Sequence, residues 1–419
     1  MTTMVRPARK SFREHDCRRA TAYDTRMSAS FPFNPPTRVL MGPGPSGAHP
    51  RVLRAMTAPI LGHLDPEFLR IMDECRDMLR QVLRTGNEVT LATPGTGTSG
   101  MEAAVMNLVE PGDKVVVGIC GYFGERIAQM AERAGGVVTR VNANWGSPTD
   151  LAGVEAAVKA TGNVKLVGVV HAETSTGVQT PIEPFAEVAR AAGSLLLVDC
   201  VTSLGGVRVD ADRWGADAVY SGTQKCLSAP PGVAPITMSP RAWAAVKARE
   251  TPCNSWYLDM SLLEAYWDNR RGYHHTAPIS MIYALHQALA LVLEEGLEAR
   301  WARHERNGRS LQAGLEAMGL VLHADEGYRL PVLTTVRIPD GVNDVDVRGA
   351  LLRRHGIEIG GGLGDLRGKV WRLGLMGESS NPGNVLLALS SLGKILREQG
   401  FKADVGGGIS AATVRLQEA

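Results

Sequence analysis

The chain has 419 residues, of which 44% are hydrophobic, and 45 Lys and Arg stand against 43 Asp and Glu, for a formal net charge of +2. Such a balance argues against a nucleic-acid binder, whose basic residues are in large and clustered excess. No stretch of about 18 apolar residues runs free of charge, Pro and Gly, so an ordinary membrane-spanning helix is not expected. The length predicts a globular protein of two or three domains.

The first 36 residues form a basic segment without an apolar period. Arginine and lysine outnumber the acids in it, and prolines 32, 35 and 36 separate it from the rest of the chain. We expect a disordered extension or an over-long gene start, with Met27 as the first residue. A targeting peptide is the alternative, although the apolar core of a secretory signal is missing.

From Thr37 onward, short apolar runs alternate with amphipathic segments. Strands are predicted at 115–119, 166–170, 195–198 and 218–220, with helices at 125–134 and 184–192 between them. Continuous apolar runs joined by helices are typical of a mostly parallel sheet that is buried on both faces. The fold class is therefore predicted as α/β.

The alternation weakens after Gly296. Helical patterns at 280–295 and 297–318 flank this glycine, and the second has the apolar spacing and charges of a helix that connects two domains. Strand, helix and strand patterns come next, at 332–338, 345–355 and 369–375. We expect a large domain at 37–296, a smaller α+β domain at 297–400 and a poorly ordered Gly- and Ala-rich tail at 401–419.

The sequence Pro-Gly-Thr-Gly-Thr-Ser-Gly-Met-Glu at 94–102 comes directly after a short apolar run and opens a helix that extends to about Val109. Its glycines allow a tight turn, and the first amides of the helix are suited to hold a phosphate. The spacing matches neither the dinucleotide fingerprint nor the Walker pattern. A capped helix after a Gly-rich turn remains an equal alternative on this sequence alone.

Asp199 ends the apolar run Leu-Leu-Leu-Val at 195–198. Ligands of α/β proteins bind at the carboxyl ends of parallel strands, where a carboxylate could pair with a cation or a protonated ring nitrogen. An Asp that caps the next turn is the competing interpretation.

Lys225 lies in the polar turn after the apolar run at 218–220. It is the only charged residue between Asp217 and Arg241. Lysines usually face solvent, but apolar surroundings lower the pKa of an amine and prepare it as a nucleophile.

The six cysteines are spread along the chain without a CxxC pair. Neither a disulfide framework nor a zinc site is predicted, and we expect no metal. Unpatterned cysteines favour a reducing cytoplasm.

Taken in order, a phosphate loop, an acid and a lysine resemble the class V aminotransferases of fold type I. The resemblance covers 37 to about 400 and is strongest to the alanine:glyoxylate and serine:pyruvate aminotransferase branch. It implies a seven-stranded type of sheet between helices and a smaller C-terminal domain. The matching stretches are 41–46, the Gly-Thr-Gly loop, 171–177, Asp199 with 203–206, 221–225, 273–276 and 369–374.

The family resemblance implies pyridoxal 5'-phosphate as cofactor and gives each matched residue a role. Lys225 would carry the cofactor as an internal aldimine and move the proton between substrate and cofactor, while Asp199 would pair with the protonated ring nitrogen. Arg372 would bind the substrate carboxylate in bidentate fashion, with Gly44 close by. The cofactor phosphate would contact Thr96, Gly97, Thr98 and Gln224.

Further roles implied by the resemblance involve the cofactor ring and a second subunit. Thr174 would lie near the ring hydroxyl, and Phe123 would stack on the ring where the related branch has Trp. Thr98 likewise replaces a His of some members. Tyr273 and Thr276 would reach the phosphate of the partner, so a homodimer with its active site at the subunit interface is expected.

The expected reaction is a ping-pong transfer from an amino acid to a 2-oxo acid. No motif offers a second arginine for a side-chain carboxylate, which favours alanine or serine as donor and glyoxylate or pyruvate as acceptor. The alternative is an (S)-ureidoglycine:glyoxylate aminotransferase of purine breakdown, which several stretches also resemble. The resemblance implies amide residues in those enzymes at the positions of His63 and Tyr273, which are absent here.

Two interpretations from other classes are weaker. A cysteine desulfurase shares the fold and cofactor, but its nucleophilic cysteine lies far downstream of the lysine, and this chain has no cysteine after Cys253. A non-catalytic relative would be expected to lose Lys225, Asp199 or Arg372, and all of them are present.

Overall fold

The computed structural model describes residues 33–418. Most of the expected N-terminal extension, including Met27, lies outside the described residues. The contacts group Arg38–Ala419 into one unit. No helix in the described part of the chain is both long and apolar enough to cross a membrane.

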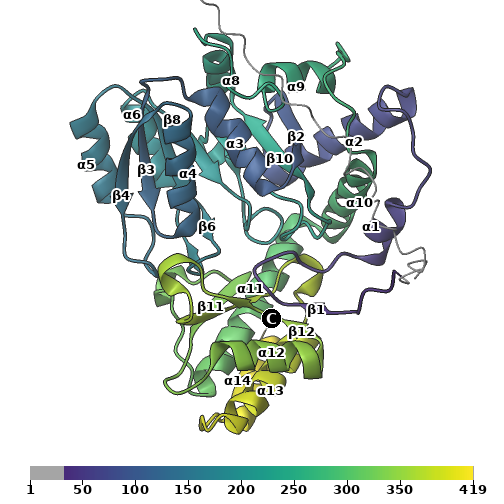
Figure 1. Cartoon of the computed structure of the whole chain (residues 1–419), viewed down its shortest axis with the longest axis vertical. Coiled ribbons are helices and arrows are strands. Elements are labelled where there is room, and N and C mark those ends of the chain that lie inside the picture. Colours follow the sequence, from purple (N-terminus) through teal and green to yellow (C-terminus); the bar gives the residue numbers. More distant parts are fainter. Residues whose placement is uncertain (1–32, 419) are drawn as a thin grey trace, which may run out of the picture. The chain divides into compact units, whose positions relative to one another are not determined.

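A seven-stranded sheet lies among helices in the upper part of Figure 1. All neighbouring strands are parallel except around β10, which runs antiparallel to both of its neighbours. In spatial order the strands are β2 (Val89–Gly95), β10 (Gly232–Met238), β9 (Ala218–Tyr220), β8 (Leu195–Asp199), β5 (Val164–Val170), β3 (Lys114–Ile119) and β4 (Val137–Asn142).

The central strands form where the sequence predicts them. In β8 and β9 every residue is buried, and in β3 every residue after Lys114 is. Consecutive buried side chains point to opposite faces of a sheet, so helices must cover both faces. The predicted mostly parallel α/β sheet is thereby confirmed.

Strands β2, β4 and β10 were not among the predicted strands. β4 is an edge strand and is only half-buried, so it lacks a continuous apolar run. β10 contains Pro235, which normally argues against a central strand. The pairing with β9 ends at Ile236, and beyond it the Ser221 amide donates to the Pro235 carbonyl oxygen at 2.8 Å, a hydrogen bond that Pro235 cannot return because it has no amide.

Helices that connect the strands cover the sheet. α3 (Gly97–Leu108) packs on β2, β9 and β10, while α4 (Tyr122–Arg133) and α5 (Leu151–Thr161) both pack on β3. α2 and α10 pack together, and α1 lies on α10. The remaining bounds are α1 (Pro50–Ala55), α2 (Pro66–Leu83), α6 (Glu183–Ala191), α7 (Ala211–Trp214), α8 (Pro240–Lys247), α9 (Met260–Trp267) and α10 (Ile279–Glu295).

A second, three-stranded antiparallel sheet has its own apolar cluster with the C-terminal helices. Its order is β11 (Leu333–Arg337), β14 (Val370–Gly374) and β13 (Gly360–Gly361). A short parallel pair joins β1 (Val39–Leu40) to β12 (Ile357–Glu358), so the first described strand meets this region. The helices are α11 (Leu297–Ala317), α12 (Asp344–His355), α13 (Pro382–Glu398) and α14 (Val405–Gln417).

The expectation of a poorly ordered C-terminal tail is wrong for most of it. α14 spans Val405–Gln417 and packs against α11 and α13 (Figure 1). Its glycines explain the miss, because they lower helix propensity yet permit close packing. A Cβ at Gly408 would lie 2.3 Å from Met318 Cγ and 2.7 Å from the Gly314 carbonyl oxygen.

Short elements complete the chain. β6 (Ala172–Glu173) and β7 (Val178–Gln179) form a two-stranded hairpin directly after β5. Three 3₁₀ turns occur later in the described chain, η1 (Glu326–Tyr328), η2 (Gly364–Leu366) and η3 (Gly377–Ser379).

Candidate active site

The parallel strands bring three carboxyl ends to one edge of the sheet. In the register, Val170 of β5 pairs with Asp199 of β8, and Asp199 pairs with Tyr220 of β9. A cavity of about 200 Å³ opens at this edge. Its lining includes Gly97, Thr98, Phe123, Thr174, Asp199, Gln224 and Lys225, seven of the residues that the sequence predicts for the site.

A larger cavity of about 650 Å³ lies among α1, α2 and α10. None of the predicted site residues lines it, and its charged residues Arg51, Arg70 and Glu74 already form ion pairs. We therefore assign the chemistry to the smaller cavity, where the predicted residues Asp199 and Lys225, both with shifted pKa values, lie together.

Lys225 is buried beside the N-terminal segment of the described chain. Its Nζ donates to the carbonyl oxygen of Pro43. Burial, with a further contribution from the charge of Arg372, lowers the pKa of the amine to about 8. An amine that loses its proton this readily is suited to nucleophilic and proton-transfer chemistry, as the apolar flanks predict.

Gly44 lies against the Lys225 side chain. Its φ is +102°, and a Cβ there would lie 2.7 Å from Lys225 Cδ and 2.9 Å from Nζ. Only glycine accommodates both the backbone angle and the close approach. Gly44 is thus adjacent to the reactive amine.

Asp199 is buried at the end of β8. Its carboxylate accepts hydrogen bonds from the Val201 amide at 2.8 Å and from the Tyr220 hydroxyl at 2.8 Å. Burial nevertheless raises the pKa of Asp199 to about 6. Within residues 33–418 no cation forms an ion pair with it, so the site has an unpaired acid.

The N-terminus of α3 faces the same cavity. Thr96 is the N-cap in extended conformation, but its side chain makes no capping hydrogen bond. Among the described residues, the amides of Gly97 and Thr98 have no acceptor. A helix N-terminus with free amides attracts an anion, which favours the phosphate interpretation over the capped helix.

Gln224 is a second residue with a polar group free to bind a ligand at this corner of the cavity. Its Oε1 is buried and has no hydrogen-bond partner within the described part of the chain. Gly97 keeps this corner narrow, since a Cβ there would lie 3.0 Å from Val201 Cγ2. A polar ligand at the α3 N-terminus would meet both residues.

Arg372 approaches from the central strand of the three-stranded sheet. Its Nε donates to Gly361 O at 2.7 Å and its Nη1 to Thr174 O at 3.2 Å. Burial lowers the pKa of its guanidinium to about 10. The side chain remains charged near neutral pH, and no carboxylate in the described residues forms an ion pair with it.

Three residues that sequence reasoning missed support the site. Glu173 is fully buried, and its carboxylate accepts hydrogen bonds from the amides of Phe123 at 3.0 Å and Gly124 at 3.4 Å. These hydrogen bonds hold the first turn of α4 in place. Burial raises the pKa of this carboxyl group. Tyr220, the second, donates to Asp199. Glu173 lies within the stretch 171–177 that matches the family, and this match is the feature of the sequence that could have identified it.

Arg126 is the third missed residue. It lies three residues after Phe123 on α4, a spacing that places both on one helix face. Its guanidinium carbon is 4.8 Å from the centroid of the Phe123 ring, and its Nη1 donates to Thr98 Oγ1 at 3.1 Å. It therefore joins the aromatic residue to the α3 N-terminus.

Tyr273 and Thr276 do not line the cavity of their own chain. Both are exposed, and 65% of the Tyr273 surface is accessible. His274 and His275 between them are buried, with their Nδ1 atoms 2.8 Å apart, as expected of packed residues. The Tyr273 ring lies 5.2 Å from the ring of His63.

The donor set fits pyridoxal phosphate. Free amides at the α3 N-terminus match its phosphate, the unpaired Asp199 matches its ring nitrogen and the Lys225 amine matches its aldehyde. Phe123 borders the space between them. Each part of the cofactor thus has a partner in the cavity.

Comparisons with known proteins agree with this assignment. A family model described as aminotransferase class-V matches residues 52–365. The (S)-ureidoglycine–glyoxylate transaminase of Bacillus subtilis (strain 168) is 40% identical over an alignment of 395 residues, which covers 90% of this chain and 95% of that protein. The alanine–glyoxylate aminotransferase of Callithrix jacchus is 40% identical over 370 residues, or 87% and 89% of the two chains.

A solved structure from Nostoc sp., an alanine–glyoxylate aminotransferase, superimposes with a TM-score of 0.87. It is 49% identical and covers 89% of this chain and 99% of its own. The likeness therefore extends through both sheets. The chain belongs to the class V aminotransferases of fold type I, and it is a transaminase with pyridoxal 5'-phosphate as cofactor.

Proposed function

We propose that this enzyme transfers the amino group of alanine or serine to glyoxylate or pyruvate by a ping-pong reaction. The observation that carries the proposal is the arrangement of arginines. Arg372 is buried near Lys225 and can bind the α-carboxylate common to all these substrates. Arg126, the arginine that lines the cavity, is engaged with Thr98 and Phe123, which leaves no second guanidinium at the described site for a side-chain carboxylate.

Bound pyridoxal phosphate supplies a conjugated ring that delocalises the electron pair left when a proton departs from the substrate Cα. Lys225 would bind the cofactor and then move that proton with its Nζ, for which a lowered pKa is suited. Asp199 would hold the ring nitrogen in its protonated form. The phosphate would be held by Thr96, Gly97, Thr98 and Gln224, the ring by Phe123 and its hydroxyl by Thr174, and Gly44 would leave room for the substrate.

The alternative donor is (S)-ureidoglycine. The relative from Bacillus subtilis supports it, whereas the relatives from Callithrix jacchus and Nostoc sp. support alanine. His63 and Tyr273 lie ring against ring and offer no amide to a ureido group. This pair of aromatic rings ranks alanine and serine first.

A donor screen with glyoxylate as acceptor tests the ranking. Purified holoenzyme is incubated with alanine, serine or freshly generated ureidoglycine, and glycine formation is measured. We expect alanine or serine to have the highest kcat/KM. Turnover of ureidoglycine well above both would transfer the assignment to the alternative.

We further propose that the active unit is a homodimer in which Tyr273 and Thr276 reach the phosphate of the partner. Both are exposed, and the segment around His63, which Tyr273 contacts, carries the exposed apolar residues Ile60 and Leu64, while Pro59 and Leu61 of the same segment line the larger cavity. Exposed apolar side chains gathered on one segment are typical of a protein–protein contact. A second copy of the chain would cover them.

Subunit hybrids test this arrangement. A hybrid dimer is made from one Lys225→Ala chain and one Tyr273→Ala chain. If each site combines Lys225 of one subunit with Tyr273 of the other, one site has both native residues and the other site has both substitutions. The hybrid should then have about half the wild-type activity. If each site used its own Tyr273, both sites would be impaired and activity would remain low.

Two expectations about organisation remain proposals. The separate apolar clusters of the two sheets support a large domain at 37–296 and a small domain starting at 297. The five described cysteines are free, and four of them are buried. Unpaired thiols support a reducing, cytoplasmic location.

A further inference from the structure

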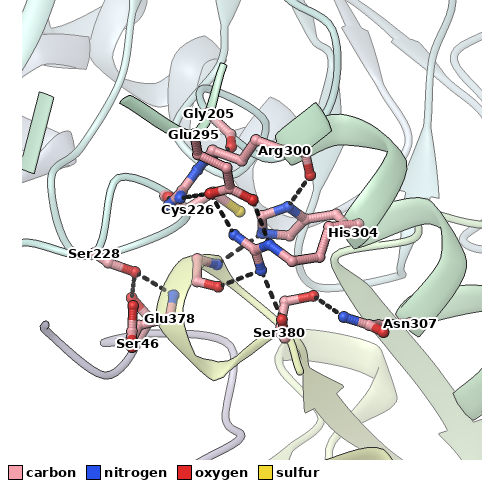
Figure 2. Close-up of polar contacts among 12 residues, drawn as sticks. Ser46, Gly205, Cys226, Ser228, Glu295, Arg300, His304, Asn307, Glu378 and Ser380 are labelled. Atoms are coloured by element: carbon pink, nitrogen blue, oxygen red, sulfur yellow. Dashed lines mark hydrogen bonds and ion pairs between the residues drawn. The ribbon is translucent and has the colours of Figure 1, made fainter. Parts of the chain in front are cut away.

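A largely buried polar cluster lies next to the Lys225 segment, at the junction of α10 and α11 (Figure 2). Its charged members are Glu295, at the end of α10, and Arg300 and Arg303, in the first turns of α11. Arg300 is 5% exposed and His304 is fully buried. The proposed function gives these residues no role.

Arg300 binds the segment that carries Lys225. Its Nε donates to Gly205 O at 2.9 Å, and its Nη2 donates to Cys226 O at 2.8 Å. Its Nη1 donates to the Glu295 carboxylate at 2.5 Å. One guanidinium thus holds the residue after Lys225 through a charge-assisted hydrogen bond.

The same cluster binds the η3 turn, which comes a few residues after the strand of Arg372. Arg303 donates to Gly377 O at 2.9 Å and to Ser380 O at 2.6 Å. His304 Nδ1 lies 2.7 Å from Arg300 O, and its Nε2 accepts the Gly377 amide at 2.8 Å. The histidine therefore joins the two halves of the cluster.

Ser228 makes a second, direct link between the two segments. Its hydroxyl accepts the Glu378 amide at 2.8 Å and lies 3.3 Å from Ser46 Oγ (Figure 2). Ser46 Oγ in turn donates to Lys225 O at 2.6 Å. The φ of Ser228 is +57°, a backbone conformation that glycine adopts at lower cost.

We propose that the cluster of Glu295, Arg300, Arg303 and His304, together with Ser228, is a positioning device that fixes the distance between the Lys225 amine and the Arg372 guanidinium. This inference rests on the proposed roles of those two residues. Lys225 follows β9 of the seven-stranded sheet and Arg372 lies in β14 of the three-stranded sheet, yet they must address the Cα and the carboxylate of one small substrate. Their relative position therefore requires a rigid connection, which the backbone between them does not provide.

The chemistry of the cluster suits positioning better than stabilisation. Buried ion pairs contribute little net stability compared with apolar residues of the same volume, because both charges lose their hydration. Guanidinium hydrogen bonds to backbone carbonyls, in contrast, are directional and hold a segment in one orientation. Arg300 and Arg303 direct their N–H groups at carbonyl and carboxylate oxygens of four separate segments.

Ser228→Gly is the most discriminating variant, because it removes the linking hydroxyl and relieves the backbone at a positive φ. Asn163→Gly is the matched control, since Asn163 is exposed, has a φ of +49° and makes no contact with the cluster. We expect Ser228→Gly to lower kcat/KM for the amino donor about 10-fold, through kcat, without lowering the melting temperature. Asn163→Gly should leave both unchanged.

Arg300→Met breaks the cluster at its centre, with Arg309→Met, at a half-exposed position of α11, as control. A small displacement of reacting groups costs about 10²-fold in rate, and we expect a loss of that size for Arg300→Met. The proton on the Lys225 nitrogen is followed in parallel through the absorbance of the bound cofactor against pH. The pH at the midpoint of this titration should rise, because Arg372 is no longer held close enough to Lys225 for its charge to repel the proton.

The outcomes separate this inference from the proposed function. A wild-type protein that neither binds cofactor nor transaminates overturns both. Active wild type with unchanged kinetics and titration midpoint in Ser228→Gly overturns the positioning role alone. So does an Arg300→Met protein that melts earlier but retains wild-type kcat/KM and midpoint. If Arg300→Met does not fold, Ser228→Gly decides.

Discussion

Two carboxylates near the Lys225 segment, the buried Asp199 and the half-buried Glu295, have opposite pKa shifts. Asp199 accepts hydrogen bonds from an amide and a hydroxyl, and its pKa is raised to about 6 because burial dominates. Glu295 also loses hydration, but two arginines bind it and lower its pKa to about 2. Among the described residues, the first acid lacks a cation and the second has two.

The presence or absence of an ion-pair partner within the chain distinguishes a structural ion pair from an acid that is left to bind a ligand. At Asp199 the protein tolerates an unpaired charge, whose cost a protonated ring nitrogen would offset. At Glu295 the compensation is built into the chain. Burial alone therefore does not mark a functional acid; the absence of an internal partner does.

The largest effect is expected at the amine of Lys225. Lys225→Ala removes both the cofactor attachment and the proton carrier, so the rate of amino transfer should fall about 10⁴-fold or more. The half-reaction with alanine is followed by stopped-flow absorbance. Lys247→Ala, at an exposed position of α8, serves as control and should react like wild type. A Lys225→Ala enzyme whose rate of amino transfer lies within tenfold of the wild-type rate would contradict the assigned role of Lys225.

Asp199→Asn retains the shape of the side chain and removes its charge. Loss of one preorganised electrostatic partner costs about 10² to 10³-fold in kcat, and we expect a decrease of that size. Steady-state kinetics at saturating donor measure it. Glu295→Gln is the comparison, and its smaller loss in kcat would confirm that only the unpaired acid takes part in chemistry.

Arg372→Lys tests the carboxylate partner. Lysine keeps the charge but lacks the planar fork of guanidinium, so KM for both the amino acid and the oxo acid should rise about 10 to 100-fold. Cofactor affinity, measured by fluorescence titration, should remain unchanged. Weaker cofactor binding with unaltered KM would place Arg372 at the cofactor instead.

The smallest effect concerns the stability of the cofactor-free protein. Asp199 has a raised folded pKa, so its stabilising proton is retained from about pH 4 to 6 and its ionised form costs stability above pH 6. Asp199→Asn should therefore raise the melting temperature at pH 7.5 by about 2–5 °C relative to wild type, with a smaller gain at pH 5.

Glu295 should behave in the opposite way. Its folded pKa is lowered, so the stability it contributes is fully present above about pH 4.5 and is lost as pH falls toward 2. Glu295→Gln should lower the melting temperature at pH 7.5. If both variants shifted the melting temperature in the same direction, the contrast between the two acids would be incorrect.

Local patterns in the sequence predict the parts of the molecule that depend on local burial. β3, β5, β8 and β9 are apolar throughout or nearly so, and each lies within a residue or two of its predicted bounds. The strand ends then identify Asp199 and Lys225. β10 was missed because it contains Pro235, which lies just beyond the last residue pair between β10 and β9, and local sequence does not show where that pairing ends.

Residues whose role depends on distant partners could not be read from local patterns. Arg300 contacts Cys226, 74 positions away, and Arg126 contacts Thr98, 28 positions away. Nothing in the charged pattern of α11 marks one arginine as buried and another as exposed. The glycines of α14 likewise suggest a flexible tail until α11 is placed against them.

Peptide mapping shows most directly whether Lys225 is the residue that binds the cofactor. The holoenzyme is reduced with borohydride, digested with trypsin and analysed by mass spectrometry. Modified Lys225 resists cleavage, so we expect an intact peptide of residues 214–241 that carries the reduced cofactor. Cofactor on any other lysine, with cleavage after Lys225 as usual, would contradict the assignment.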